Sequence, residues 1–145
     1  MKKIFLIVLI LSITACSSDF RQEYATYQDF SESVTQRNKS WFFDSIGHDA
    51  YNLKSVSSIG EPLFCFSVFQ YKDTNYYKSI LNSNEYVLST KLEFIEMLKK
   101  HLNKKPKWFI NENSIQVNNL FFYKKGRWYI ANDYENKIIY SVLSN

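Results

Sequence analysis

The stretch "LFFYKKGRWYIANDYENKIIYSVLSN", residues 120–145, decides the fold of this chain. It holds three runs rich in aromatic and β-branched residues, and the short polar segments "KKG" and "DYENK" separate them. Such runs between turn residues predict β-strands. Because short connections join neighbouring strands that run in opposite directions, the stretch predicts a C-terminal antiparallel meander.

Residues 89–107, "STKLEFIEMLKKHLNKKPK", predict a helix that covers one face of the meander. Thr90 and Glu93 have the spacing of a capping box, and Pro106 ends the helix. Apolar residues recur along one side at helical spacing. The expected buried stripe consists of Leu92, Ile95, Leu98 and Leu102, widened by Phe94 and Met97.

Residues 25–38, "ATYQDFSESVTQRN", predict another helix, the first of the domain. Thr26 is its expected cap, with Asp29 three positions later in the place of the usual Glu or Gln. An apolar stripe runs through this segment at spacings of three and four residues. The stripe consists of Tyr24, Tyr27, Phe30 and Val34.

Two segments between these helices predict strands. Residues 62–71, "PLFCFSVFQY", are apolar on both faces up to Gln70, which indicates a central strand. Alternation within residues 50–59 indicates a second strand. The crowded "WFF" before it indicates a packed loop or turn, and "KDTN" after residue 71 indicates a turn. We therefore expect the α+β class: an antiparallel sheet of about four to six strands with a C-terminal meander, packed against two helices, in one domain of residues 23–145.

An apolar segment precedes this domain. Lys2 and Lys3 are followed by an almost unbroken apolar run, residues 4–13. As a helix, a run of this length covers roughly 15 Å, about half of the ~30 Å hydrocarbon core of a bilayer. The run is therefore too short to span a membrane comfortably, and a short positive segment followed by such a run is typical of a signal peptide.

The motif "ITAC", residues 13–16, resembles the lipobox of bacterial lipoproteins. This resemblance implies that a signal peptide of residues 1–15 is removed, that the Cys16 thiol receives a diacylglyceryl group, and that its new amine is acylated. Residues 16–22 are then a lipidated tether, and the acyl chains on Cys16 bind the membrane, since two or three chains make attachment durable. The alternatives are a plain secretory signal with an incidental cysteine and an uncleaved anchor.

Ser17 follows Cys16, where Asp would imply retention in the inner membrane. In lipoproteins similar to those of enteric bacteria, the absence of Asp implies the outer membrane, with the chain on its periplasmic face. The segments from "YATYQDF" through "WFF", and the ending "RWYIANDYENKIIYSV", are similar to small uncharacterised lipoproteins of bacteria. That resemblance covers most of the mature chain and brings no assigned activity or residue roles.

Charge and composition narrow the choice of partner. The chain has 18 Lys and Arg against 14 Asp and Glu, and removal of Lys2 and Lys3 with the signal peptide leaves a net charge of +2. So small a charge gives no reason to expect a nucleic-acid partner. Aromatic residues make up 18% of the chain, so some are expected at the surface, where Tyr, Trp and Arg form binding hot spots.

Residue types of catalytic and metal sites are scarce. The chain has two histidines, His48 and His101, and no paired-cysteine motif, so we expect no metal, no cofactor and no catalytic residue. With Cys16 lipidated, Cys65 stands alone in an apolar run, which indicates a buried, inert thiol. The alternatives are a disulfide with another molecule and a thiol enzyme in which His48 activates Cys65.

Five lysines lie within residues 99–107. The simpler interpretation is a solvated helix end, where cations interact favourably with the helix dipole. The alternative is a surface that faces anionic lipid headgroups or an acidic partner.

The leading hypothesis is a non-enzymatic lipoprotein of the cell envelope, acting as a tethered binding or accessory module. One alternative is an immunity or inhibitor protein that neutralises a toxin delivered to the periplasm. The other is an envelope hydrolase, which predicts a concave pocket that gathers acidic groups or His48 and shifts their pKa values.

Overall fold

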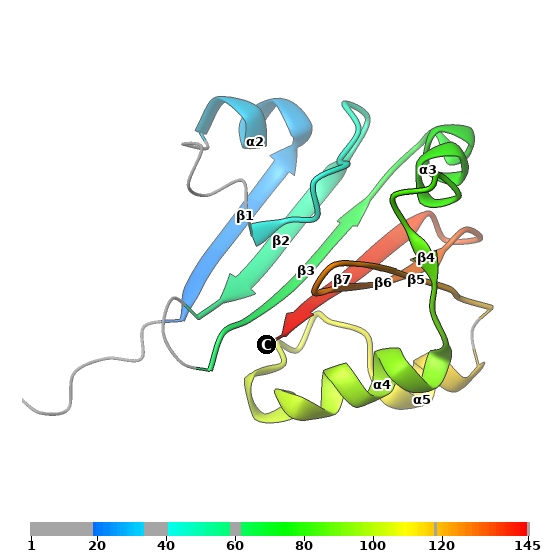
Figure 1. The fold of residues 1–145 in the computed structure, drawn as a ribbon. Coiled ribbons are helices and arrows are strands. Elements are labelled where there is room, and N and C mark those ends of the chain that lie inside the picture. The colour runs from blue at the N-terminus through cyan, green and yellow to red at the C-terminus, as the bar shows by residue number, and fades with distance from the viewer. Residues whose placement is uncertain (1–18, 34–40, 59–61, 118, 145) are drawn as a thin grey trace, which may run out of the picture.

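The computed structural model describes residues 19–33, 41–58, 62–117 and 119–144 (Figure 1). They form one seven-stranded antiparallel sheet in the order β1-β2-β3-β7-β6-β5-β4, with helices packed on it. The predicted α+β class is confirmed, and the sheet has more strands than expected. The strands are β1 (Phe20–Thr26), β2 (Tyr51–Ser57), β3 (Phe64–Gln70), β4 (Val87–Leu88), β5 (Phe121–Lys125), β6 (Trp128–Asp133) and β7 (Ile138–Ser144).

The predicted meander is confirmed, because β5, β6 and β7 are neighbours in the sheet and pair in antiparallel register. A two-residue turn joins β5 to β6, since Lys125 pairs with Trp128. Gly126 in this turn has φ +57°, a conformation that glycine adopts without steric cost.

β3 is an interior strand of the sheet, between β2 and β7, as its apolar sequence predicts. Its seven residues pair with those of β7, from Phe64 opposite Ser144 to Gln70 opposite Ile138. This pairing joins the N-terminal strands β1, β2 and β3 to the C-terminal strands. Successive side chains of a strand point to opposite faces, so both strands supply residues to two separate cores.

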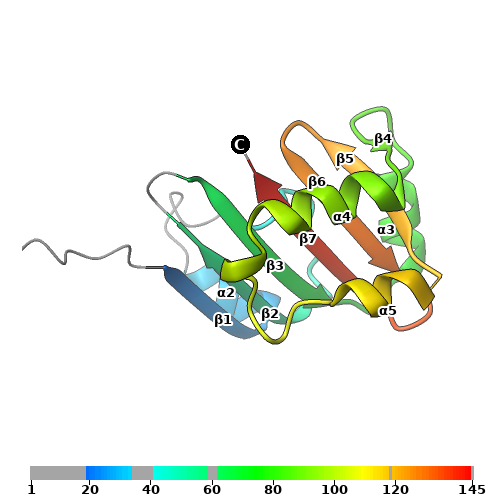
Figure 2. The same ribbon diagram turned by 90° about the horizontal axis from the view of Figure 1, so that it is seen from below.

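One face of the sheet, here called the α4 face, is covered by α4 (Lys91–Lys100) and α5 (Glu112–Val117), as Figure 2 shows. Its core contains Phe66, Phe94, Leu98, Phe109 and Val142. The other face, here called the loop face, is covered by α2 (Tyr27–Ser33), α3 (Thr74–Leu81) and part of the segment between α2 and β2. Its core contains Phe30, Phe43, Phe69, Tyr77 and Ile139.

The structure assigns residues 20–26 to β1, where the sequence predicts the end of the tether and the start of a helix. β1 pairs along β2 from Phe20 opposite Ser57 to Thr26 opposite Tyr51. Residues 20–22, predicted as part of the tether of residues 16–22, therefore belong to the sheet. Tyr24, predicted as part of the helical stripe, lies in the same strand. Pairing with β2 stabilises this strand, and the local sequence of residues 20–26 does not predict that pairing.

The expected cap of the first helix is confirmed at Thr26. The Asp29 carboxylate accepts a hydrogen bond from the Thr26 backbone N–H at 3.0 Å, and Thr26 Oγ1 accepts one from the Asp29 N–H at 3.2 Å. α2 then runs to Ser33, and Val34 lies outside the described residues.

Two further helices, α3 (Thr74–Leu81) and α5 (Glu112–Val117), are not predicted by the sequence pattern. The segment "KDTN" is not only a turn, because Asp73 caps α3 by accepting hydrogen bonds from the N–H groups of Asn75 at 2.9 Å and Tyr76 at 3.1 Å. α3 has eight residues and α5 has six. Two turns of helix are too few to produce a recognisable apolar period.

The helix at α4 is confirmed with its capping box, but its predicted stripe is partly wrong. Phe94, Ile95 and Leu98 are buried, whereas Leu92 is 65% exposed and Leu102 is 47% exposed. His101 takes the place expected for Leu102, because positions 94, 98 and 101 follow one face of the helix. A 3₁₀ turn, η2 (Leu102–Lys104), then carries Leu102 away from the core.

His101→Gln is expected to make stability less dependent on pH under mildly acidic conditions. Burial and the neighbouring Lys100 charge lower the pKa of His101, whose Nε2 lies 3.0 Å from Ser144 Oγ. The unfolded chain then binds a proton more readily, so the free energy of unfolding falls as pH drops below about 6.5.

Thermal unfolding between neutral pH and about pH 5 tests this prediction. Wild-type protein should lose more stability over that range than His101→Gln. The exposed His48→Gln variant is the matched control and should behave as wild type. Equal pH slopes in all three proteins would contradict a role for His101.

Candidate functional site

Cys65 is buried, as the sequence predicts, and its side chain has no exposed surface. The thiol donates a hydrogen bond to the Trp41 carbonyl at 3.1 Å. Burial raises the pKa of this thiol far above its usual value, so it stays protonated at neutral pH. Because the thiolate is the nucleophile, Cys65 is unsuited to covalent catalysis.

The structure does not bring His48 and Cys65 together. His48 is exposed and lies edge-on against Tyr27, with 4.7 Å between ring centroids, just before β2 begins at Tyr51. Cys65 pairs with Ser57 at the opposite end of β2. The two ends of β2, Tyr51 and Ser57, are six residue steps apart, roughly 20 Å at about 3.3 Å per residue. The thiol-enzyme alternative therefore lacks its base.

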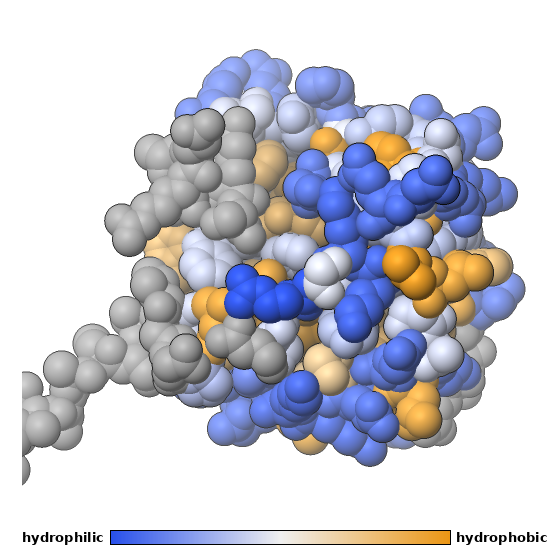
Figure 3. Space-filling model, viewed as in Figure 1, coloured by the Kyte–Doolittle hydropathy of each residue, from blue (hydrophilic) through white to orange (hydrophobic). Residues whose placement is uncertain are grey.

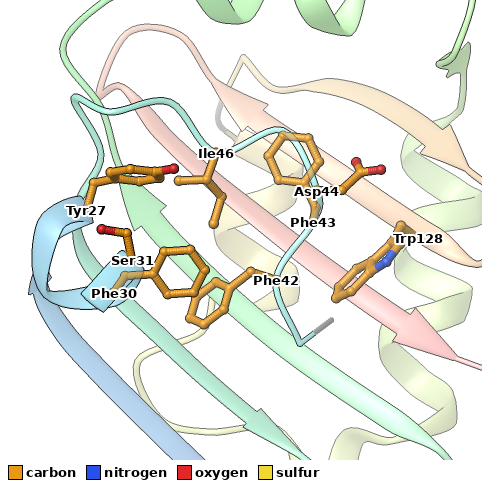
Figure 4. A pocket seen from close by; sticks show the side chains of 8 residues that line it. All are labelled: Tyr27, Phe30, Ser31, Phe42, Phe43, Asp44, Ile46 and Trp128. Carbon is orange, nitrogen blue, oxygen red and sulfur yellow. The ribbon is translucent and has the colours of Figure 1, made fainter. Parts of the chain in front are cut away.

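A pocket of about 510 Å³ opens on the loop face, between α2, the segment that follows Trp41, and the start of β6 (Figure 4). The residues that line it are Tyr27, Phe30, Ser31, Phe42, Phe43, Asp44, Ile46 and Trp128. Most of this lining is aromatic. Its volume and apolar character match those of small-molecule pockets. We take this pocket as the candidate site and call it the aromatic pocket.

Contacts between rings fix the walls of the aromatic pocket. The centroids of Phe30 and Phe42 are 5.2 Å apart with the rings inclined at 69°. Phe43 stacks on Phe69 of β3 at 5.8 Å, with only 6° between the ring planes. Such pairs contribute about 0.5–1.5 kcal/mol each beyond the buried area. Tyr27 and Trp128 are half-buried, so their rings remain available to a ligand.

A charged cluster lies beside the pocket at Asp44. Lys125 Nζ donates hydrogen bonds to Asp44 at 2.8 Å and to Glu85 at 2.7 Å, and it lies 5.0 Å from the Tyr86 ring centroid. Burial raises the pKa of Asp44, but the hydrogen bond and charge of Lys125 outweigh burial, so the net pKa is lowered. Burial also raises the pKa of Tyr86 to about 12. Asp44 is therefore a carboxylate at neutral pH and a poor proton donor.

Polar anchors hold the segment that carries Phe42, Phe43 and Ile46. The Gly47 N–H donates to Tyr77 Oη at 2.8 Å, and this hydrogen bond is buried. One carboxylate oxygen of Asp49 accepts from the N–H groups of Lys72 at 2.7 Å and Asp73 at 2.6 Å. A Cβ on Gly47 would lie 2.8 Å from the Tyr76 ring, so glycine is needed for this close approach.

The lysine run divides between two surfaces. Lys104, Lys105 and Lys107 line a groove near the start of β1, whereas Lys99 and Lys100 lie on α4 and are absent from the lining. Apolar surface is exposed at the β4 edge, where Val87 is 66% and Leu88 is 76% exposed. Figure 3 shows orange surface at the position of β4 in Figure 1.

The sequence does not predict the aromatic pocket, although it predicts a packed loop or turn at "WFF", where Phe42 and Phe43 are indeed buried outside α-helix and strand. Its walls come from α2, from the residues after Trp41 and from β6, which the chain order separates widely. One feature of the sequence is related to the pocket: the chain has more aromatic residues than a single hydrophobic core requires. In fact they fill two cores, and a few border the pocket.

Tyr77→Phe is expected to lower the free energy of unfolding by about 1–3 kcal/mol, because the buried Gly47 N–H loses its acceptor. Urea unfolding followed by circular dichroism measures this loss. Tyr76→Phe, at a side chain that is 38% exposed, is the control and should stay within about 0.5 kcal/mol of wild type. Equal stabilities of the two variants would show that the Gly47–Tyr77 hydrogen bond does not stabilise the segment.

Among the described residues, no three His, Cys, Asp or Glu side chains come close enough to share a metal ion. No helix there combines the length and hydrophobicity that a membrane span requires. Comparison with family models, curated proteins and solved structures gives no match to this chain.

Proposed function

We propose that this protein is a non-enzymatic lipoprotein of the cell envelope, held by acyl chains on Cys16, which binds an apolar or aromatic group in the aromatic pocket. The "ITAC" motif at residues 13–16 supports the anchor, and Ser17 supports the periplasmic face of the outer membrane. The aromatic pocket is the single observation that favours binding as the task of the folded domain.

The chemistry of the pocket favours binding over hydrolysis. Asp44 is the one carboxylate among the described residues that line it, and its pKa is lowered. A general acid needs a raised pKa, and a carboxylate pair needs a second acidic group. His48 contacts Tyr27 but does not line the pocket. The lining therefore offers ring faces and one ionised acceptor, which suit recognition.

An immunity or inhibitor protein is the second candidate, and the β4 edge favours it. Val87 and Leu88 are exposed on a sheet edge, and edge strands with apolar side chains are sites where another protein adds. Crosslinking in intact cells followed by mass spectrometry tests this candidate. Crosslinks from β4 to a secreted toxin would support it, and crosslinks from α2 alone would not.

Cys16→Ser is expected to abolish lipidation of the full-length protein expressed in a bacterial host. Wild-type protein should partition into the detergent phase with acyl mass on its N-terminal peptide, because two or three chains give durable attachment. The variant should lack that mass and keep residues 1–15. Cys65→Ser, which changes the other cysteine, is the matched control and should be lipidated. A Cys16→Ser protein that matures at the usual size and stays in the membrane would refute the anchor.

Filling the aromatic pocket is expected to block binding of N-phenyl-1-naphthylamine, a neutral aromatic probe. Wild-type protein should enhance the probe's fluorescence saturably, with one site per chain. Ser31→Trp places a ring in the lining and should weaken binding about tenfold or more. Glu32→Trp, on the same helix outside the lining, should bind as wild type. Equal binding by the two variants would remove the pocket from the proposal.

A further inference from the structure

A second hollow lies on the α4 face, where η2 and the residues after it approach β1. It has a volume of about 570 Å³. Its lining is Asp19, Arg21, Val56, Asn103, Lys104, Lys105, Pro106, Lys107 and Trp108. Four of these residues are cations and one is an acid, which gives the lining a net charge of +3. We call it the basic groove.

Among the described residues, the ion pairs near the groove leave most of this charge uncompensated. Asp19 pairs with Lys104 at 3.6 Å, and both side chains are partly exposed. Glu23, in the adjoining hollow, pairs instead with Lys54 at 3.7 Å. Exposed pairs of this kind contribute little to stability, typically below about 1 kcal/mol. Folding alone therefore gives little reason to gather these cations.

The groove lies close to the residue that carries the proposed anchor. Asp19 is three residues after Cys16, and three residues span at most about 11 Å. Lys104 is in contact with Asp19, so it also stays near the anchored end. The potential of an anionic membrane extends over roughly 8–10 Å at physiological salt. An acylated Cys16 therefore lets these lysines approach within the range of that potential.

Trp108 adds the second property of a membrane-facing surface. It is half-buried, it lies 6.1 Å from Phe109 between ring centroids, and it borders three adjoining hollows on the α4 face. Tryptophan prefers the headgroup region of bilayers, where its ring is apolar and its N–H is wet. Lysines beside it can extend their charges to phosphates while their stems stay on apolar surface.

We propose that the basic groove is a docking surface for anionic phospholipid headgroups of the membrane that holds Cys16, an inference that rests on the proposed anchor. Arg21, Lys104, Lys105 and Lys107 bind the phosphates, and Trp108 enters the headgroup layer. The α4 face then turns toward the bilayer at the start of β1. The aromatic pocket is on the opposite face of the sheet and stays open to the periplasm.

The test uses the lipidated mature protein in vesicles of brominated phosphatidylcholine, alone or mixed with phosphatidylglycerol in equal parts. Bromolipid quenching of Trp108 is read as the difference between wild type and Trp108→Phe. This component should be quenched about twofold or more strongly when phosphatidylglycerol is present, and high salt should remove the difference. The same quenching in both vesicles would overturn the docking surface.

Lysine variants test which charges act. Replacing Lys104, Lys105 and Lys107 with Gln together should abolish the effect of phosphatidylglycerol, because each lysine near an anionic surface is worth about fivefold in binding. The corresponding Arg variants should retain it, which separates charge from damage to the fold. The matched control replaces Lys72, Lys78 and Lys137, which lie at the opposite end of the sheet, with Gln. Loss of the effect in that control as well would overturn the proposal.

Failure of the anchor has a different signature. If Cys16 carries no acyl chain, the mass of the mature protein shows it, and the protein does not float with phosphatidylcholine vesicles. If the protein floats with both kinds of vesicle but Trp108 quenching is unchanged, the anchor stands and the docking surface is wrong.

Discussion

The pairing of β3 with β7 is the constraint on which the rest of the structure depends. Through seven residue pairs it joins β1, β2 and β3 to the later strands, and among the described strands no other pairing connects the two groups. A buried hydrogen bond between Ser67 and Ser141 crosses the pair and closes a sequence separation of 74 residues. Contacts so far apart in the chain carry a large entropic cost of closure. The side chains that both strands place in two cores offset that cost.

The shape of the aromatic pocket depends on the pairing of β3 with β7. Phe69 on β3 stacks against Phe43, so the central strand positions the segment that forms one wall. Trp128 pairs with Leu143 of β7, so the opposite wall also depends on the central register. A slip of one residue between β3 and β7 would send Phe69 to the other face and remove the support of Phe43. The polar anchors at Gly47 and Asp49 then fix the segment from its far end.

Local patterns made the meander and α4 predictable, whereas the features that depend on distant partners were not. Turn residues and the capping box of Thr90 and Glu93 lie within a few positions of the elements that they define. β1 alternates charged Arg21 and Glu23 with buried, polar Gln22, so no apolar period marks it. Predicting the aromatic pocket from the sequence would require the register of the whole sheet, because its walls come from distant parts of the chain. The apolar run around Cys65 is the exception, because it predicts an interior position in the sheet. A strand that is buried on both faces consists almost entirely of apolar residues, and this composition is visible in the sequence.

The two faces of the sheet are covered in ways that suit different tasks. Helices cover the α4 face, and helix ends project long cationic side chains such as Lys104 beyond the core. Loop and short helices cover the other face, where large rings such as Phe42 and Trp128 line a hollow. Because opposite faces of one sheet cannot both turn toward a bilayer, anchoring by the basic groove would leave the hollow exposed to solvent. In the proposed arrangement, one face of the sheet serves attachment and the other serves recognition within one small domain.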